Sequence, residues 1–106
     1  MIITPANHIH GYRIVRAFGL VQGNTIRARH MGKDILAGLK NLVGGEIEEY
    51  TKMMGEAREQ ALDRMRAHAE AVGGNAVVDV RFSPSYVMGA ASEIMAYGNA
   101  VLIEPD

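Results

Sequence analysis

Two histidines stand one residue apart near the start of the sequence, in the stretch NHIHGYR at residues 7–13. If this stretch is extended, residues i and i+2 project to the same side with Cα atoms ~7 Å apart, so both imidazoles can reach one ion. A zinc, nickel or copper ion needs at least one further ligand and supporting hydrogen bonds behind it. The side chains considered as that third ligand are Glu93, His30 and Asp34. On this basis the predicted metal site consists of His8, His10 and Glu93, and its cofactor is a divalent metal ion.

The same two histidines also fit an exposed loop that holds no ligand, and this is the interpretation that the sequence favours. Soft metals prefer thiolate ligands, and the chain has no cysteine. His68 lies off the apolar stripe of a predicted helix and is expected at the surface. The methionines after Met1 have no regular spacing, which is typical of core and interface filling rather than of thioether binding.

Catalytic patterns are missing from the sequence. No serine stands in the Gly-x-Ser-x-Gly pattern of a nucleophile elbow, and no glycine-rich phosphate loop opens a helix. The residues therefore weigh against an enzyme, although an active site assembled between subunits would leave no local pattern in one chain.

Length and composition limit the class of protein. At 106 residues the chain has room for one domain, which we take as residues 1–106. Its apolar fraction of 48% and charged fraction of 22% are those of a globular protein. A net charge of −1 gives no general attraction for nucleic acid or for a membrane surface. No stretch has the charge and apolar pattern of a signal peptide or the ~20 apolar residues of a membrane helix, so a cytoplasmic location is expected.

Two periodicities alternate along the chain. A β-hairpin is predicted from strands at 12–21 and 25–29, with Gly23-Asn24 as its turn. Apolar residues at helical spacing then predict a short helix over 34–43 and a long helix over 46–72, which Gly73-Gly74 ends.

Two further strands are predicted over 75–83 and 93–104, with a break at Pro84 and Gly89. On the third strand, Ala76, Val78, Val80 and Phe82 are expected to share one face. The last strand is apolar on both faces, and one helix layer can cover only one of them. Either an added loop or a second subunit must cover the other face, and we favour the second subunit. The long helix, ~40 Å at 1.5 Å per residue, also outruns a compact domain of this size, roughly 34 Å across.

Several short motifs occur in an order that resembles the YbjQ family, a family of small uncharacterised proteins labelled as heavy-metal-binding. These motifs are GYRIV, LVGG, EAREQALDRM, AVGGNAVV and AYGNAV. The resemblance implies an α+β subunit of two layers, with a small antiparallel sheet packed on one long and one short helix. It also implies a dodecin-like subunit that assembles with itself into a ring, a pentamer. The chain departs from the family pattern at Asp79, where glycine is common, at Asn99, where threonine is usual, and at Ser83, where an aspartate often stands.

The function expected from these observations is that of a non-enzymatic, ring-forming cytoplasmic binding protein whose ligand is a metal ion or a small molecule held at subunit interfaces. Two alternatives remain open at this stage. One is an enzyme whose active site is assembled between subunits, and the other is a ring that serves as a scaffold for a protein partner.

Overall fold

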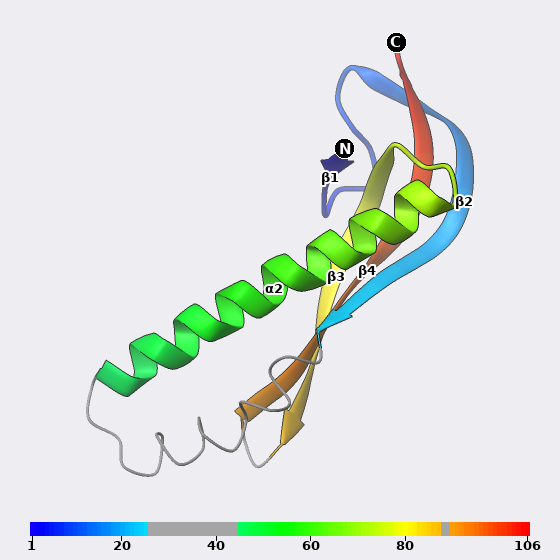
Figure 1. Cartoon of the computed structure of the whole chain (residues 1–106). Helices are drawn as coiled ribbons and strands as arrows, with labels where there is room; N and C mark the ends of the chain where they lie inside the picture. The colour runs from blue at the N-terminus through cyan, green and yellow to red at the C-terminus, as the bar shows by residue number, and fades with distance from the viewer. Residues whose placement is uncertain (26–44, 88–89) are drawn as a thin grey trace.

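The structure is a computed structural model, and it describes residues 1–25, 45–87 and 90–106. Along the chain the elements are β1 (Ile2–Ile3), β2 (Tyr12–Thr25), α2 (Gly45–Ala71), β3 (Ala76–Val87) and β4 (Ala90–Pro105). Figure 1 shows the long helix α2 lying across one face of the sheet. The fold is therefore α+β, as expected. The short helix predicted over 34–43 and most of the strand predicted over 25–29 lie outside the described residues.

The four strands form one sheet in the order β1-β3-β4-β2. β4 pairs antiparallel with both of its neighbours, β2 and β3. β1 pairs with β3 in parallel, with Ile2 opposite Ala76 and Ile3 opposite Val77. The sheet is thus mixed rather than purely antiparallel, because the N-terminal segment runs beside β3.

The predicted hairpin turn at Gly23-Asn24 is wrong. β2 continues through both residues to Thr25 and stays paired with β4, with Gly23 opposite Ala96. Gly23 is needed for close packing within the strand and does not form a turn. A Cβ built on Gly23 would overlap the carbonyl oxygen of Ala61 and the backbone nitrogen of Met65, so the backbone of α2 lies directly against the backbone of β2.

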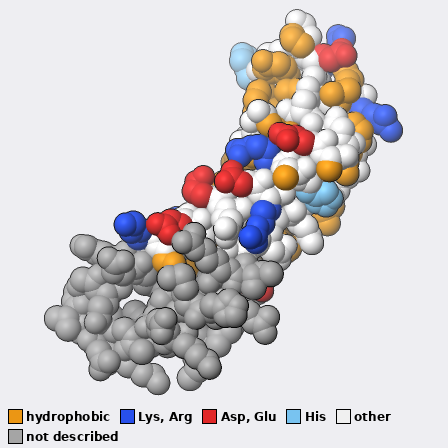
Figure 2. Space-filling model, in the orientation of Figure 1, with side chains coloured by type: hydrophobic (Ala, Val, Ile, Leu, Met, Phe, Trp, Pro, Cys, Tyr) orange, Lys and Arg blue, Asp and Glu red, His pale blue; other side chains and the backbone are white. Residues whose placement is uncertain are grey.

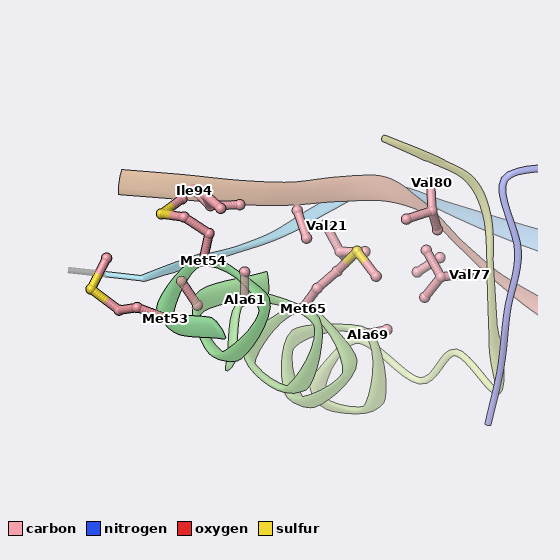
Figure 3. Close-up of a cluster of buried hydrophobic side chains, with 12 residues drawn as sticks. Val21, Met53, Met54, Ala61, Met65, Ala69, Val77, Val80 and Ile94 are labelled. Carbon is pink, nitrogen blue, oxygen red and sulfur yellow. The ribbon is translucent and has the colours of Figure 1, made fainter. Parts of the chain in front are cut away.

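The long helix agrees with the predicted span to within one residue at each end. Its buried stripe packs over β2 and β4, and Figure 3 shows these side chains meeting Val21, Val77 and Ile94 from the sheet. The stripe consists of Met53, Met54, Ala57, Ala61, Met65 and Ala69. Three methionines are thus core residues, as expected. Gly73, at φ 100°, ends the helix, and Gly74 N–H donates to the Ala69 carbonyl at 2.9 Å.

A β-bulge changes the faces of β3. Its pairing with β4 shifts register between Val78 and Arg81, and Asp79 adopts a left-handed φ of 56°. Val78 therefore joins one apolar cluster and Val80 the other, on the side of α2. The predicted single face containing both residues is wrong, because strict alternation stops at a bulge. The predicted break at Pro84 is also wrong, since β3 runs to Val87, whereas Gly89, the other residue of that prediction, lies outside the described residues.

Both faces of β4 are used, as its sequence predicts. Ala96 and Ala100 lie beneath α2. On the opposite face, Val101 and Ile103 are buried in a second cluster that Ile9 partly covers. Within one subunit, Ile9 of the N-terminal segment covers part of this end of the face.

The molecule is elongated. Its radius of gyration is 16.6 Å and its extents are 54 × 22 × 16 Å, whereas a compact chain of this length has a radius of gyration of about 13 Å. Of the residues the structure describes, none form a helix long and apolar enough to cross a membrane.

Candidate functional site

His8 and His10 lie in the segment between β1 and β2, and both side chains are exposed. The segment consists of bends and a turn rather than a strand, so the spacing argument for an extended chain does not apply to it. Nδ1 of His8 lies 2.8 Å from Oδ1 of Asn7. Ile9, between the two histidines, packs against the cluster formed by Val101 and Ile103 with their neighbours. The pair is thus fixed to the sheet through Ile9 while its imidazoles face solvent.

Glu93 lies far from this pair within one subunit. The start of β2 pairs Tyr12 with Pro105, and its end pairs Thr25 with Ile94, beside Glu93. Roughly 40 Å of strand therefore separates Glu93 from the histidines, at about 3.3 Å per residue. The Glu93 carboxylate instead accepts a hydrogen bond from Nδ2 of Asn24 at 3.1 Å.

The structure thus does not bring the three predicted ligands together in one subunit. Within residues 1–25, 45–87 and 90–106, no group of three or more histidine, aspartate and glutamate side chains could hold a metal ion. The other ligand candidates, His30 and Asp34, lie outside the described residues. The metal site therefore stays a prediction.

A polar row crosses the face of the sheet opposite α2. Gln22 and Arg81 stand on either side of Tyr97, each directly opposite it on a neighbouring strand, so the three side chains share a face. Arg81 Nη1 donates to the carbonyl oxygens of Pro5 at 2.9 Å and of Val80 at 2.8 Å. Alternation along β3 and β4 could have indicated this row, but the bulge at Asp79 hides the register.

This row offers hydrogen-bond donors and one aromatic ring, without a nucleophile paired with a base. It is the arrangement of a solvated sheet face. It adds no evidence for a catalytic site.

A shallow groove of about 630 Å³ follows the solvent face of α2. Its charged and polar lining residues are Lys52, Glu56, Arg58, Glu59, Gln60 and Asp63. Gln60 Oε1 accepts a hydrogen bond from the buried hydroxyl of Thr25 at 2.8 Å. Figure 2 shows acidic and basic side chains mixed along this face. Because the two signs are interleaved, the groove selects neither anions nor cations.

Exposed large hydrophobic side chains gather at the two edge strands of the sheet. Met1 and Ile2 are at β1, and Tyr12, Ile14, Val15 and Leu20 are on β2; Val72 and Phe82 are the other two in the described part of the chain. Figure 2 shows hydrophobic side chains at the end of the molecule where the N-terminal segment and the start of β2 lie.

The fold and the short sequence motifs are those of a family of small α+β proteins. A family model described as "Putative heavy-metal-binding", YbjQ_1, matches residues 1–104, and the chain belongs to this family. A UPF0145 protein of Dehalococcoides mccartyi is 59% identical over 104 residues, covering 98% of this chain and 100% of its own length. A UPF0145 protein of Pyrococcus abyssi is 52% identical, covering 98% of this chain and 91% of its own length.

One solved structure has a similar fold. It is the crystal structure of a protein of unknown function from Pediococcus pentosaceus, assigned to the DUF74 family. The match covers 100% of this chain and 98% of that one, with a TM-score of 0.51 and 18% identity. This similarity supports the fold alone.

Proposed function

We propose that the protein is a non-enzymatic binding protein that works in the cytoplasm as a pentameric, dodecin-like ring and holds a metal ion or a small molecule between its subunits. The observation that carries this proposal is that β1 and β2, the two edge strands of the sheet in the described part of the chain, both expose large hydrophobic side chains. Soluble proteins rarely leave such side chains together on open strands unless another chain covers them.

The ligand half of the proposal rests on the description of the family and on the two exposed histidines. One subunit supplies His8 and His10, two exposed histidines on either side of Ile9, which packs against the sheet. A stable site for a divalent ion needs at least one more ligand. In a ring that ligand comes from a neighbouring subunit, with Glu93 as the candidate from the sequence.

Native mass spectrometry of tag-free protein, purified without a chelator or metal-affinity resin, tests both halves. The expected result is a pentamer that carries an integral number of metal ions or of small-molecule masses. A bare pentamer would support the ring without the ligand, and a monomer would contradict the ring.

A matched pair of variants tests the histidines after Zn²⁺ is added to the purified protein. His8→Ala with His10→Ala is expected to abolish retained zinc while leaving the subunit count unchanged, because both side chains are exposed. His68→Ala removes another exposed histidine, on α2, and is expected to leave retained zinc unchanged. Equal zinc in all three proteins would overturn the histidine site.

A further inference from the structure

The polar row on the sheet face opposite α2 has an aromatic ring in its middle. Tyr97 stands on β4, between Gln22 of β2 on one side and Arg81 of β3 on the other. The tyrosine side chain is half-buried, whereas Gln22 and Arg81 are exposed. The ring is therefore supported by the strands on both sides and is still accessible from solvent.

Helix α2 lies on the other side of the sheet from Tyr97 (Figure 1). Ala96, the neighbour of Tyr97 along β4, is buried beneath α2, and successive side chains of a strand point to opposite faces. On the side of Tyr97, Ile9 packs farther along β4, in the cluster with Val101 and Ile103. The described part of the chain thus places neither a helix nor a strand over the polar row.

The row next to Tyr97 on this face is polar at both ends. Asn24 and Ser83 stand on either side of Met95, each directly opposite it on a neighbouring strand. The cores of protein–protein interfaces are depleted in charged side chains. A ring flanked by amide, hydroxyl and guanidinium groups suits a small planar ligand with polar edges, because bases stack on aromatic side chains of a sheet in this way.

Arg81 gives the polar row a positive charge in a fixed position. Its Nη1 donates to the carbonyl oxygens of Pro5 at 2.9 Å and of Val80 at 2.8 Å, which leaves Nε and Nη2 to bind an anion. Among the described residues Arg81 forms no salt bridge. The one acid of β3, Asp79, accepts a hydrogen bond from Asn99. A phosphate is the complementary group, since a guanidinium binds it with two parallel hydrogen bonds.

Gln22 supplies the opposite flank of the row. Its side-chain amide is exposed and makes no hydrogen bond to another described residue. An amide holds a donor beside an acceptor, the pattern that matches the edge of adenine. Adjacent strands lie about 4.8 Å apart, so roughly 10 Å separates the backbones at Gln22 and Arg81, with Tyr97 between them. This spacing is comparable to the distance between the base edge and the phosphate of a nucleoside monophosphate.

We infer that the polar row binds a free adenine nucleotide, with the base stacked on Tyr97, the base edge bonded to Gln22 and the phosphate bound by Arg81. The row holds one cation and the chain has a net charge of −1, which favours a single nucleotide over a nucleic acid strand. All three side chains come from one subunit. The site is therefore additional to the one proposed between subunits and does not use the histidine pair.

Isothermal titration calorimetry of the full chain tests the stacking contact with adenosine monophosphate and adenosine as probes. Tyr97→Leu is expected to weaken the binding of both probes by about tenfold or more, because the stacked ring is lost. Tyr97→Phe keeps the ring and is expected to bind both probes as the wild type does. Tyr12→Leu removes another tyrosine, at the far end of β2, and is expected to change neither affinity.

The phosphate contact is tested by the difference between the two probes. Arg81→Gln is expected to weaken adenosine monophosphate by about tenfold or more and to leave adenosine unchanged, since only the phosphate contacts the guanidinium. A purely structural role, through Pro5 and Val80, would weaken both probes alike. Arg58→Gln, at an exposed position of α2, is the matched control and is expected to change neither affinity.

Circular dichroism checks that each variant is folded. If Tyr97→Leu does not fold, Gln22→Ala takes its place, at an exposed position, and is expected to weaken both probes several-fold. If Arg81→Gln does not fold, Arg81→Lys takes its place. It is expected to weaken adenosine monophosphate alone, because an ammonium group cannot bind a phosphate in the same bidentate way.

Three results would overturn the nucleotide site. They are no binding of adenosine monophosphate by the wild type at millimolar concentration, unchanged affinity in folded Tyr97→Leu, and an equal loss of both probes in a folded Arg81 variant. An adenine oligonucleotide that binds more tightly than adenosine monophosphate would overturn the assignment to a free nucleotide. Each of these leaves the proposed ring and its zinc retention standing, and a monomeric wild type that binds adenosine monophosphate would contradict only the ring.

Discussion

Asp79 and Asn99 contact each other across the bulge in the sheet, where Nδ2 of Asn99 donates to Oδ2 of Asp79 at 3.3 Å. The family resemblance implies glycine and threonine at these two positions, so two departures of this chain from the family pattern touch each other. The φ of 56° at Asp79 explains why glycine suits that position. Aspartate tolerates this conformation better than most residues, and the side chain of Asn99 adds a hydrogen bond.

Substitutions of Asp79 are expected to show how much its left-handed backbone conformation costs in free energy of unfolding. Asp79→Ala should lower the free energy of unfolding by about 1 kcal/mol, because alanine tolerates a left-handed φ poorly and loses the bond to Asn99. Asp79→Gly should be nearly neutral, since relief of strain offsets the greater freedom of the unfolded chain. Urea unfolding measures both values. If the two variants are equally stable, the φ at this residue carries no energetic cost.

The contact between Asp79 and Asn99 is expected to appear as a coupling energy. In a double-mutant cycle with Asp79→Gly and Asn99→Thr, the interaction should be roughly 0.5–1 kcal/mol, since both side chains are at least partly exposed. Strictly additive effects in urea unfolding would show that the hydrogen bond contributes nothing to stability.

Gly23 is expected to be intolerant of any side chain. Gly23→Ala should destabilise the protein by about 2 kcal/mol or more, because its Cβ would overlap the backbone of α2 at Ala61 and Met65. Gly55→Ala is the matched control, because a Cβ there meets only Nη2 of Arg58 at 3.8 Å. That change should stabilise the helix by up to about 1 kcal/mol. Thermal unfolding of both variants checks the contrast, and a stable Gly23→Ala protein would contradict the close contact.

Ala100 is expected to report on the core of the subunit and not on an interface between subunits. It is fully buried beneath α2. Ala100→Asp should lower the free energy of unfolding by several kcal/mol, roughly 3 or more, because it buries an unpaired carboxylate. Ala67→Asp, at an exposed position of α2, should change stability by less than about 1 kcal/mol. Denaturant unfolding distinguishes the two. Near-native stability of Ala100→Asp would mean that this face is not packed as the structure has it.

The helix and the positions of the last two strands follow from the sequence because their signals are local. The repeat of Met54, Ala57, Ala61, Met65 and Ala69 gives α2 its buried face, and glycine ends it at Gly73. Side chains three and four residues apart lie on one face of any helix, so this pattern can be recognised without knowing what the helix packs against.

Gly23 and Asp79 show where local reasoning fails. Gly23-Asn24 has the composition of a turn, yet the close approach of α2 requires glycine within a strand. At Asp79 a bulge reverses the alternation of β3, and only pairing with β4 reveals it. In both cases the deciding contact comes from residues far away along the chain, so tertiary packing overrides the local preference.

By itself the sequence determined the α+β class, the long helix, a last strand that is apolar on both faces and membership of the family. Only the tertiary structure decided that Ile9 covers one end of that strand, that β1 and β2 are the edges of the sheet, and that His8 and Glu93 lie at opposite ends of it. Periodicity and composition indicate whether each residue is buried or exposed. The distance between residues far apart in sequence depends instead on strand order and register. These are set by pairing between two segments, and the sequence of either segment alone does not show them.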